Sequence, residues 1–336
     1  MAHIKRLAYF GYYLKQMNWP LLGRFMAHTQ ATKGLGRGRQ WAMILRDSLR
    51  YNISPLEWYQ FGFANLSAAD KATWAGTGTM YEFQRRANPS RAREVLDDKR
   101  AFFKAYHPFF RHAVYDREAL AAQPAQLTEL LNQHDRLVLK AANGKCGSSV
   151  RFIDTAGRQA AELLAAMQAD GQDLLETPIE QHAELNRLSP SGVNTVRIFT
   201  ALDANDRPYL LGCRLRISVD SPVDNLAAGN LAAPVDDQTG KVTGPGVYSD
   251  ITPESVHPIT GTSIEGFRIP YWPDCVQMAL EAQQLYTENR SIGWDIAVTP
   301  DGPGLIEGNH DWCKLVWQLP VGRGLKPLLD DVALEN

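Results

Sequence analysis

The sequence predicts a protein of the α+β class, in which a helical N-terminal region precedes a half that is rich in β-strands. Up to about residue 110, segments such as PLEWYQFGF and DDKRAFFKAYHPFF repeat apolar residues at intervals of three to four, the period of a helix with one buried face. Asp97 or Asp98 is expected to cap the second segment. From Arg136 onward, short apolar runs such as RLVLKAA, TVRIFTAL and GWDIAV predict strands.

The N-terminal region differs from the rest of the chain in charge. The first 50 residues carry nine basic side chains and one acid, Asp47, whereas the 336-residue chain has a net charge of -2. A basic segment with aromatic residues is expected to contact an anionic membrane surface or an acidic partner. The alternative is a solvated face of helices that pack on the body of the protein. The overall charge gives no reason to expect nucleic acid as a partner.

Other sequence features argue against a secreted, membrane-spanning or zinc-binding protein. The apolar run from Leu7 to Leu14 is too short for a signal peptide, and no stretch approaches the roughly 18 apolar residues of a membrane span. The four cysteines are widely spaced and form no CxxC pair, so we expect neither a disulfide scaffold nor a zinc site. A cytoplasmic location is expected, with the inner face of the membrane as a docking surface for the basic N-terminus.

The segment GWDIAVTPDGPGLIEGN predicts a hairpin with an acidic face. If its turn is symmetric about Asp301, Asp295 lies opposite Glu307, and Asn309 shares the same face. Two facing carboxylates repel, and a cation between them relieves the repulsion; oxygen ligands of this kind suit Mg²⁺ or Mn²⁺. The alternative is an exposed hairpin with ordinary surface charges. The residues expected to point into the core are Trp294, Ile296, Val298 and Ile306.

A second candidate region, LVLKAANGKCGSSV, combines a lysine with a loop of small residues. Lys140 ends an apolar strand, where its ammonium group requires an anionic partner. Backbone N–H groups of the following loop could bind phosphate, although the segment matches neither GxxxxGK[ST] nor GxGxxG. A plain hairpin turn is an equally good interpretation. The candidate loop residues are Gly144, Lys145, Gly147, Ser148 and Ser149.

Three further groups of polar residues are candidates for the same site. The segment LLETPIEQHAEL could line an adenine and a ribose, or it could be a helix start with solvated acids. The β-rich runs TVRIFTAL and YLLGCRLRISV carry Arg197, Arg214 and Arg216, whose guanidinium groups could bind phosphate or carboxylate, or neutralise the acidic hairpin. His257, in HPITG, is a loop histidine of a kind that is more often structural than catalytic.

The order of these segments resembles the ATP-grasp superfamily and, more closely, its sugar-transfer-associated branch. The matching stretches run from about residue 50 to residue 325. They are PLEWYQFGF, LDDK, VLKAANGKCGSSV, QHAELNRLSPSGVNTVRIFT, HPITGTSIEGFRIPYW and IGWDIAVTPDGPGLIEGNHDW. The loop contains Cys146 and only two glycines, fewer than many loops of this superfamily.

The resemblance implies two α+β subdomains that grip ATP between antiparallel sheets. The helical region would cover residues 1–95, the first subdomain residues 96–180 and the second residues 181–330. Lys99, Lys140 and the loop from Gly144 to Ser149 would contact ATP. The other implied ATP contacts are Glu176, Thr177, Pro178 and Ile179 at the adenine and Glu184 at the ribose. The implied ligands of one or two Mg²⁺ ions are Asp295, Glu307 and Asn309. Arg197 or Arg214 would stabilise the reacting centre, and the implied substrate contacts are Arg216, His257, Thr260 and Gly261.

The resemblance also implies a ligase. A substrate carboxylate would take the γ-phosphoryl group of ATP, and an amine or another nucleophile would then displace phosphate. The expected substrate is a small molecule or a glycan precursor, framed in part by the long stretch from residue 221 to 273. A stretch of this length either binds something or contains strands that the pattern does not reveal. Two alternatives stay open: a phosphotransferase that stops after transfer to a hydroxyl, and a non-catalytic partner that docks on a glycosyltransferase through the basic N-terminus.

Overall fold

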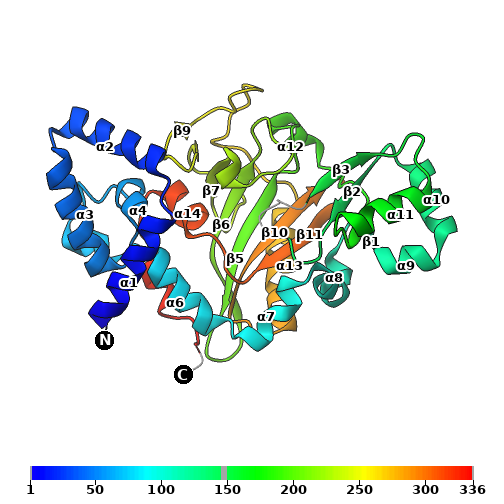
Figure 1. Cartoon of the computed structure of the whole chain (residues 1–336), viewed down its shortest axis with the longest axis horizontal. Helices are drawn as coiled ribbons and strands as arrows, with labels where there is room; N and C mark the ends of the chain where they lie inside the picture. Colours follow the sequence, from blue (N-terminus) through cyan, green and yellow to red (C-terminus); the bar gives the residue numbers. More distant parts are fainter. Residues whose placement is uncertain (1, 145–149, 335–336) are drawn as a thin grey trace.

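The computed structural model describes residues 2–144 and 150–334. A seven-stranded sheet lies at the centre, a four-stranded sheet lies at one side of it, and most of the N-terminal helices gather at the other side (Figure 1). The paired strands of both sheets run antiparallel. The predicted α+β class is therefore confirmed.

The N-terminal helices begin and end at residues that favour helix termini. The Asn18 side chain accepts a hydrogen bond from the first turn of the second helix, and Gly34, with φ of 65°, ends that helix. Ser54 and Glu57 form a capping box, and Asp98 caps α8 as predicted. The helices are α1 (Ala2–Lys15), α2 (Trp19–Lys33), α3 (Arg37–Tyr51), α4 (Pro55–Gln60), α5 (Ala68–Ala72), α6 (Thr77–Ala87), α7 (Ser90–Asp97) and α8 (Lys99–Tyr106).

The smaller sheet has the strand order β1-β4-β2-β3. Its strands are β1 (Val114–Asp116), β2 (Arg136–Lys140), β3 (Arg151–Asp154) and β4 (Leu174–Glu176). One face is covered by α9 (Arg117–Ala122), α10 (Pro124–Gln133) and α11 (Ala160–Ala169). Leucines of these helices and strands share one core, in which Leu120, Leu127, Leu137 and Leu175 are buried. Strand β2 ends at Lys140 and strand β4 ends at Glu176.

The larger sheet has the strand order β11-β10-β5-β6-β7-β8-β9. Its strands are β5 (Thr195–Leu202), β6 (Pro208–Ile217), β7 (Leu231–Val235), β8 (Gly246–Val247), β9 (Pro253–Glu254), β10 (Ser291–Thr299) and β11 (Gly302–Asn309). Helix α13 (Trp272–Leu285) packs on one face, where Ile198, Leu215 and Trp294 are buried. The other face packs against α6 and α14 (Lys314–Gln318) through Phe83 and Trp317. Helix α12 (Ala183–Leu188) precedes β5, and short 3₁₀ turns lie at His107–Phe109, Leu226–Ala228, Leu319–Val321 and Lys326–Leu329.

Helix α8 connects the two sheets. The backbone N–H of Lys99, its first residue, donates to Ala142 O at 3.0 Å, just beyond the end of β2. The following residues of α8 pack against β11, and Phe102 and Tyr106 enter the core of the larger sheet. The first turn of α8 therefore lies between the end of β2 and the β10–β11 hairpin.

The N-terminal helices are joined to the C-terminal segment by buried polar contacts. Lys314 Nζ lies 3.0 Å from Glu57 Oε1, with the two side chains 18% and 3% exposed. The Gln318 side chain accepts a hydrogen bond from Ala75 N and donates one to Ala75 O. Helix α4 thus belongs to the same packed body as the larger sheet.

The long stretch from residue 221 to 273 contains strands that the sequence did not predict. Strands β7, β8 and β9 extend the larger sheet from β6 outward, and the remaining residues connect them. Among the residues that the structure describes, we find no helix with both the length and the apolar character that a membrane crossing requires.

Candidate active site

The β10–β11 hairpin brings Asp295 directly opposite Glu307, as the sequence predicted. The predicted symmetric turn is wrong, however. Thr299 pairs with Gly302, which makes the turn one residue tighter, and a β-bulge between Asp295 and Ile296 then restores the predicted pairing. The bulge also corrects the core prediction: Leu305 is fully buried, whereas Ile306 is only half-buried. Trp294, Ile296 and Val298 are buried as predicted.

A row of charged residues crosses the larger sheet from this hairpin. On the strands β11, β10, β5 and β6, Glu307, Asp295, Arg197 and Arg214 occupy successive paired positions. Because paired positions share one face of a sheet, all four side chains leave the same face. The row therefore places two carboxylates beside two guanidinium groups.

Asp295 is held by two arginines. Arg197 donates from Nε to Oδ1 and from Nη2 to Oδ2, the second bond at 2.8 Å, and Arg216 donates from Nη1 to Oδ2 at 2.8 Å. Burial by itself would raise the pKa of Asp295, but the two guanidinium groups hold it well below its usual range. The Asp295 carboxylate is thus ionised, 3% exposed and already bonded at both oxygens.

Glu307 lies in a different environment from Asp295. Burial, followed by the neighbouring negative charge of Asp295, raises the pKa of Glu307. Asn309 donates from Nδ2 to Glu307 Oε1 at 3.2 Å and to Gly293 O at 3.3 Å. The oxygens of a carboxylate and a neighbouring carboxamide are ligands that suit a divalent cation. Glu307 and Asn309 therefore fit a divalent ion better than Asp295 does.

In residues 2–144 and 150–334, His, Cys, Asp and Glu side chains form no group of three or more that could hold a metal ion. The ligand set for an ion at the hairpin would therefore include Asn309, and the remaining positions would be filled by water or substrate oxygens, as is common for Mg²⁺. The residues fit such an ion through the donor chemistry of Glu307 and Asn309.

The lysine at the end of β2 is fixed by a buried carboxylate. Lys140 Nζ lies 2.6 Å from Glu176 Oε2, and His112 Nε2 lies 3.2 Å from the same oxygen. Burial alone would raise the pKa of Glu176, but Lys140 and His112 lower it to about 2. The ionised Glu176 side chain thus holds the Lys140 ammonium group in place. The sequence analysis did not identify His112, which contacts the same carboxylate.

Lys99 lies between the Lys140–Glu176 pair and the β10–β11 hairpin. We call the whole set of residues the charged cluster; it comprises Lys99, His112, Lys140, Glu176, Arg197, Arg216, Asp295, Glu307 and Asn309. Lys99 Nζ donates to Gly144 O, where the described part of the candidate phosphate loop ends. Burial lowers the pKa of Lys99; Glu307 opposes this shift and Lys140 adds to it. Lys99 is thus close enough to both residues for their charges to act on it. The other predicted loop residues lie outside the described part of the chain, namely Lys145, Gly147, Ser148 and Ser149.

The predicted adenine and ribose residues occupy mixed positions. Thr177 donates its N–H to Ala113 O and accepts a hydrogen bond from Ala113 N at its hydroxyl, each at 3.0 Å, so it continues the β1–β4 pairing. Of the next two residues, Pro178 is exposed and Ile179 is half-buried. Glu184 is exposed in the first turn of α12 and pairs with Arg187. For Glu184, this geometry favours a solvated helix acid over a ribose contact.

The Arg214 side chain does not join Arg197 at Asp295, where the prediction for the reacting centre would place it. Its guanidinium group donates from Nε to Trp317 O at 2.9 Å and from Nη1 to Cys213 O at 2.6 Å. It therefore lies away from Asp295, although its Cα occupies the charged row. Burial lowers the pKa of Arg214 to about 10. Arg214 connects β6 to α14, and Arg197 remains the candidate from that prediction.

Two of the predicted substrate contacts, His257 and Thr260, are also structural. His257 is buried, its Nε2 lies 2.9 Å from Ser218 O, and its Nδ1 accepts a hydrogen bond from Thr260 N at 3.2 Å. The Thr260 hydroxyl donates to Leu188 O at 2.8 Å, and Gly261 has φ of 69°. Both nitrogens of the histidine are thus used to fasten a loop. The loop interpretation of His257 fits the structure, and a substrate contact does not.

Arg216 lies inside the cluster, and its second partner was missed by sequence reasoning. Arg216 Nη2 lies 2.8 Å from Asp224 Oδ1. Asp224 also accepts hydrogen bonds from the backbone N–H and the hydroxyl of Thr195. No motif in the sequence indicated Asp224, because it lies in the irregular segment after β6. The Arg216 guanidinium group is thus shared between Asp224 and Asp295.

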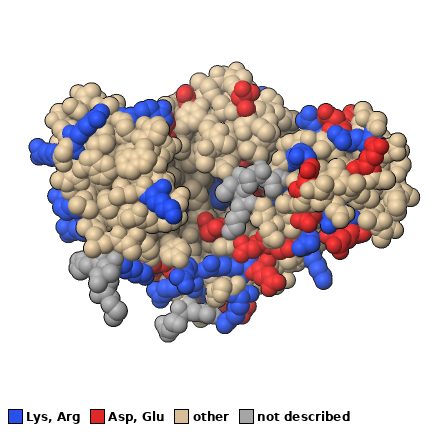
Figure 2. Space-filling model, viewed as in Figure 1, with Lys and Arg blue, Asp and Glu red and all other residues tan. Residues whose placement is uncertain are grey.

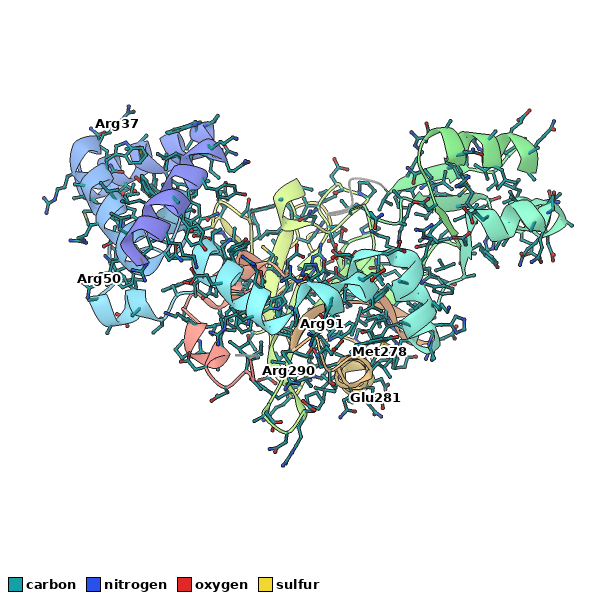
Figure 3. All side chains as sticks on the ribbon, turned by 60° about the horizontal axis from the view of Figure 1, so that its bottom comes forward. Arg37, Arg50, Arg91, Met278, Glu281 and Arg290 are labelled. Carbon is teal, nitrogen blue, oxygen red and sulfur yellow. The ribbon has the colours of Figure 1, made fainter. Side chains whose placement is uncertain are left out.

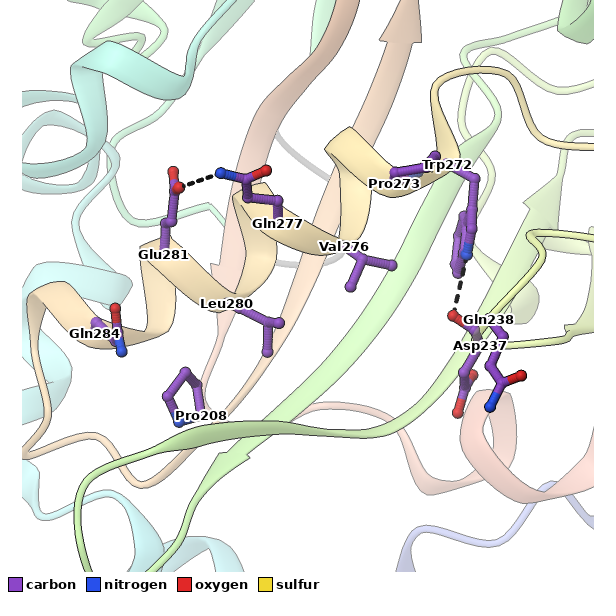
Figure 4. Close-up of a pocket in the computed structure, with 10 residues that line it drawn as sticks. All are labelled: Pro208, Asp237, Gln238, Trp272, Pro273, Val276, Gln277, Leu280, Glu281 and Gln284. Carbon is purple, nitrogen blue, oxygen red and sulfur yellow. Dashed lines mark hydrogen bonds between the residues drawn. The ribbon is translucent and has the colours of Figure 1, made fainter.

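A separate groove lies beside α13, between that helix and the start of β6 (Figure 4). Val276 and Leu280 supply apolar walls, and Pro208 closes one end. Its polar members include Asp237 and Glu281. Among the described residues, its lining does not overlap with the charged cluster, so the groove plays no part in the site described above.

The charged cluster draws its residues from both antiparallel sheets and from the start of α8. A family model described as sugar-transfer associated ATP-grasp matches residues 79–333. The chain belongs to this family, and its expected resemblance to the ATP-grasp superfamily is confirmed. A comparison with curated protein sequences gave no significant match.

Solved structures with a similar fold were also found. A biotin carboxylase from Campylobacter jejuni has a TM-score of 0.47 and 12% identity, over 86% of this chain and 60% of that one. An N5-carboxyaminoimidazole synthetase from Staphylococcus aureus has a TM-score of 0.43 and 6% identity, over 72% and 54%. A D-alanyl-alanine synthetase A from Vibrio cholerae has a TM-score of 0.41 and 12% identity, over 69% and 60%. The chain spans 41% to 61% of the length of the solved structures compared.

Proposed function

We propose that the chain is an ATP-dependent, ADP-forming ligase that joins a carboxylic acid to an amine or a hydroxyl. The observation that carries this proposal is the arrangement of Lys99 and Lys140 on one side of the cluster and Glu307 with Asn309 on the other. Two ammonium groups suit the phosphates of a nucleotide, and the carboxylate–amide pair suits the Mg²⁺ or Mn²⁺ that accompanies it. Membership of the ATP-grasp superfamily supports the same assignment.

The residues of the cluster would divide the work by charge. Lys99 and Lys140 would bind phosphate oxygens, and Glu176 would keep Lys140 in place. Glu307 and Asn309 would hold the metal ion, which offsets negative charge on the phosphates when it is bound. Arg197 is kept in place by Asp295 and is the candidate for stabilising an oxyanion at the acyl carbon.

The proposed reaction has two steps. A carboxylate oxygen of the acid attacks the γ-phosphorus of ATP, the bond from that phosphorus to the bridging oxygen breaks, and ADP leaves. The nucleophile then attacks the acyl carbon, the bond from that carbon to the phosphate oxygen breaks, and the nucleophile loses its proton to solvent. The protein contributes positioning and electrostatic stabilisation, so no nucleophilic side chain is needed.

We infer that the acid or its acceptor is a glycan or a glycan precursor. The support for this inference is the family's association with sugar transfer. The use of ATP favours a cytoplasmic site of reaction. The stretch from residue 221 to 273 is the candidate frame for the acceptor, because it borders Arg216 through Asp224.

Calorimetry with ATP and Mg²⁺ tests the proposal, using the wild type, Glu307→Gln and Glu184→Gln as a matched control. We expect micromolar binding that requires Mg²⁺ in the wild type and in Glu184→Gln, and at least a tenfold loss in Glu307→Gln. ADP release should then be screened with acids plus amines, and with hydroxyl compounds alone. Release with a hydroxyl compound and no acid would replace the ligase by a phosphotransferase, and the absence of ATP binding in all three proteins would refute both.

A further inference from the structure

The surface of α1–α3 carries charge of one sign. Most of its basic side chains are exposed, whereas Asp47 has a side-chain exposure of 2% and pairs with Arg46 at 2.9 Å and with Lys71 at 2.7 Å. Lys5 pairs at 2.8 Å with Glu82 of α6, whose side chain is 44% exposed. Among the described side chains of residues 5–51, no carboxylate is therefore exposed. In Figure 2, Lys and Arg are spread over the lobe formed by these helices. The exposed basic residues are Lys5, Lys15, Arg24, Lys33, Arg37, Arg39, Arg46 and Arg50.

Helix α1 adds an exposed apolar face to this basic surface. Leu7 and Tyr12 are 56% and 57% exposed, and Ala8 and Gly11 are exposed between them. Positions 7, 8, 11 and 12 share one face of a helix because they recur at the spacing of one turn. Trp19, 53% exposed, follows at the start of α2. This face lacks a cover from the described part of the chain.

Helix α3 provides a row of exposed arginines. Arg39, Arg46 and Arg50 are spaced by seven and four residues and so lie on one side of the helix. Leu45, 42% exposed, precedes Arg46 in the sequence and lies on another side of the helix. Arg37 and Arg50 mark the two ends of α3, at the margin of the helical lobe that faces away from the two sheets (Figure 3). The row therefore extends along most of the helix at the edge of the molecule.

We propose that the surface of α1–α3 binds a membrane that contains anionic lipid. Exposed leucine, tyrosine and tryptophan side chains enter the headgroup region, and flanking lysines and arginines neutralise the lipid phosphates. An acidic protein partner is the alternative occupant, and its binding would not depend on the lipid composition of a vesicle.

This inference is separate from the proposed ligase activity. Helices α1–α3 precede residue 79, where the match to the family model begins. They nevertheless belong to the packed body, because α1 packs on α3, and α2 and α3 pack on α4. Helix α4 in turn binds the C-terminal segment through Glu57 and Lys314. A membrane bound at α1–α3 would thus hold the charged cluster in a defined orientation.

Sedimentation with vesicles tests the inference. The full chain is mixed with vesicles of phosphatidylcholine, or of phosphatidylcholine with phosphatidylglycerol, at about 0.05 and 0.5 M salt. We expect binding to the anionic vesicles that weakens at high salt, and little binding to the neutral ones. Arg39→Glu with Arg50→Glu should weaken binding roughly tenfold or more. The matched control, Lys104→Glu with Arg136→Glu, reverses two exposed basic residues elsewhere and should bind as the wild type does.

The apolar contribution is tested with Leu7→Ser and Tyr12→Ser together, which should weaken binding at both salt concentrations. The inference is overturned if the wild type does not bind anionic vesicles, or if the Arg39/Arg50 variant binds as well as its control. An acidic protein such as a glycosyltransferase would then be the better occupant of this surface. Calorimetry of ATP with the Arg39/Arg50 variant reports on the ligase proposal independently, because those residues lie outside the charged cluster.

Discussion

Glu307 lies directly opposite Asp295 across the β10–β11 hairpin, and Arg197 lies opposite Asp295 on its other side. The two carboxylates are nearest neighbours on one sheet face, yet their pKa values are shifted in opposite directions. The arginines neutralise Asp295, and the remaining negative charge raises the pKa of Glu307. This asymmetry separates a structural carboxylate from a candidate ligand, and it leads to predictions that distinguish the two.

Replacing Glu307 by Gln should stabilise the metal-free protein at neutral pH. Because the pKa of Glu307 is raised above its ordinary value of 4.5, its ionisation in the folded state costs stability at pH values above that value. The variant removes this cost but also removes the proposed ligand. We therefore expect a thermal midpoint at or above that of the wild type without Mg²⁺, and a smaller rise on adding Mg²⁺ with ATP. An equal rise in both proteins would exclude Glu307 as a ligand.

Replacing Arg197 by Met should destabilise the protein strongly. The substitution leaves the buried Asp295 carboxylate without its bidentate partner, and breaking a buried ion pair from one side costs about 3–5 kcal/mol. The free energy of unfolding is measured in urea. The double variant Arg197→Met with Asp295→Asn should regain part of the loss, because the uncompensated charge is removed. A double variant that loses the sum of the two single effects would show that the residues do not interact.

The sequence was sufficient to predict the acidic hairpin but not its detailed geometry. Alternation along a strand places Glu307 and Asn309 on one face, and Asp295 shares that face because the β-bulge offsets the tighter turn. The bulge at Ile306 could not be predicted, because no residue of the segment marks where β11 carries an extra residue. The pattern of polar residues thus indicated the face, and the tighter turn and the bulge together set the register.

The sequence could not predict which partners the arginines of β6 bind. Arg214 and Arg216 are two residues apart on β6 and share a face, yet Arg216 reaches Asp295 and Arg214 turns to Trp317 O. The partner of Arg214 lies 103 positions away in the sequence. His112 was missed for the same reason, since its partner Glu176 is 64 positions distant. Side-chain direction over such separations is set by packing, which a single sequence does not reveal.

The Glu176 carboxylate should make the free energy of unfolding fall as the pH is lowered into the acid range. Its pKa is about 2 in the folded protein, against an ordinary value of 4.5. A lowered carboxyl pKa stabilises the folded state above the ordinary value, and this contribution is lost as the pH falls from about 4.5 towards 2. Glu176→Gln should therefore be less stable than the wild type at pH 7, with a difference that narrows on acidification. A difference that stays constant from pH 7 to about pH 3 would contradict this assignment.

The buried pair of Lys314 and Glu57 should be essential for joining the N-terminal helices to the body of the protein. The Lys314 side chain is 18% exposed and that of Glu57 is 3% exposed, and Glu57 also accepts hydrogen bonds from the backbone and hydroxyl of Thr77. Lys314→Met leaves this carboxylate buried without its cation, so the free energy of unfolding should fall by about 3–5 kcal/mol. The exposed pair of Lys5 and Glu82 provides the control, and Lys5→Met should leave the urea midpoint unchanged. If both lysine variants unfolded at the wild-type midpoint, the Glu57 network would not hold the helices to the sheet. Lys314→Met could instead split the urea unfolding transition, so that helix α4 unfolds before the larger sheet. In that case the pair would join two units that unfold separately and would not belong to one core.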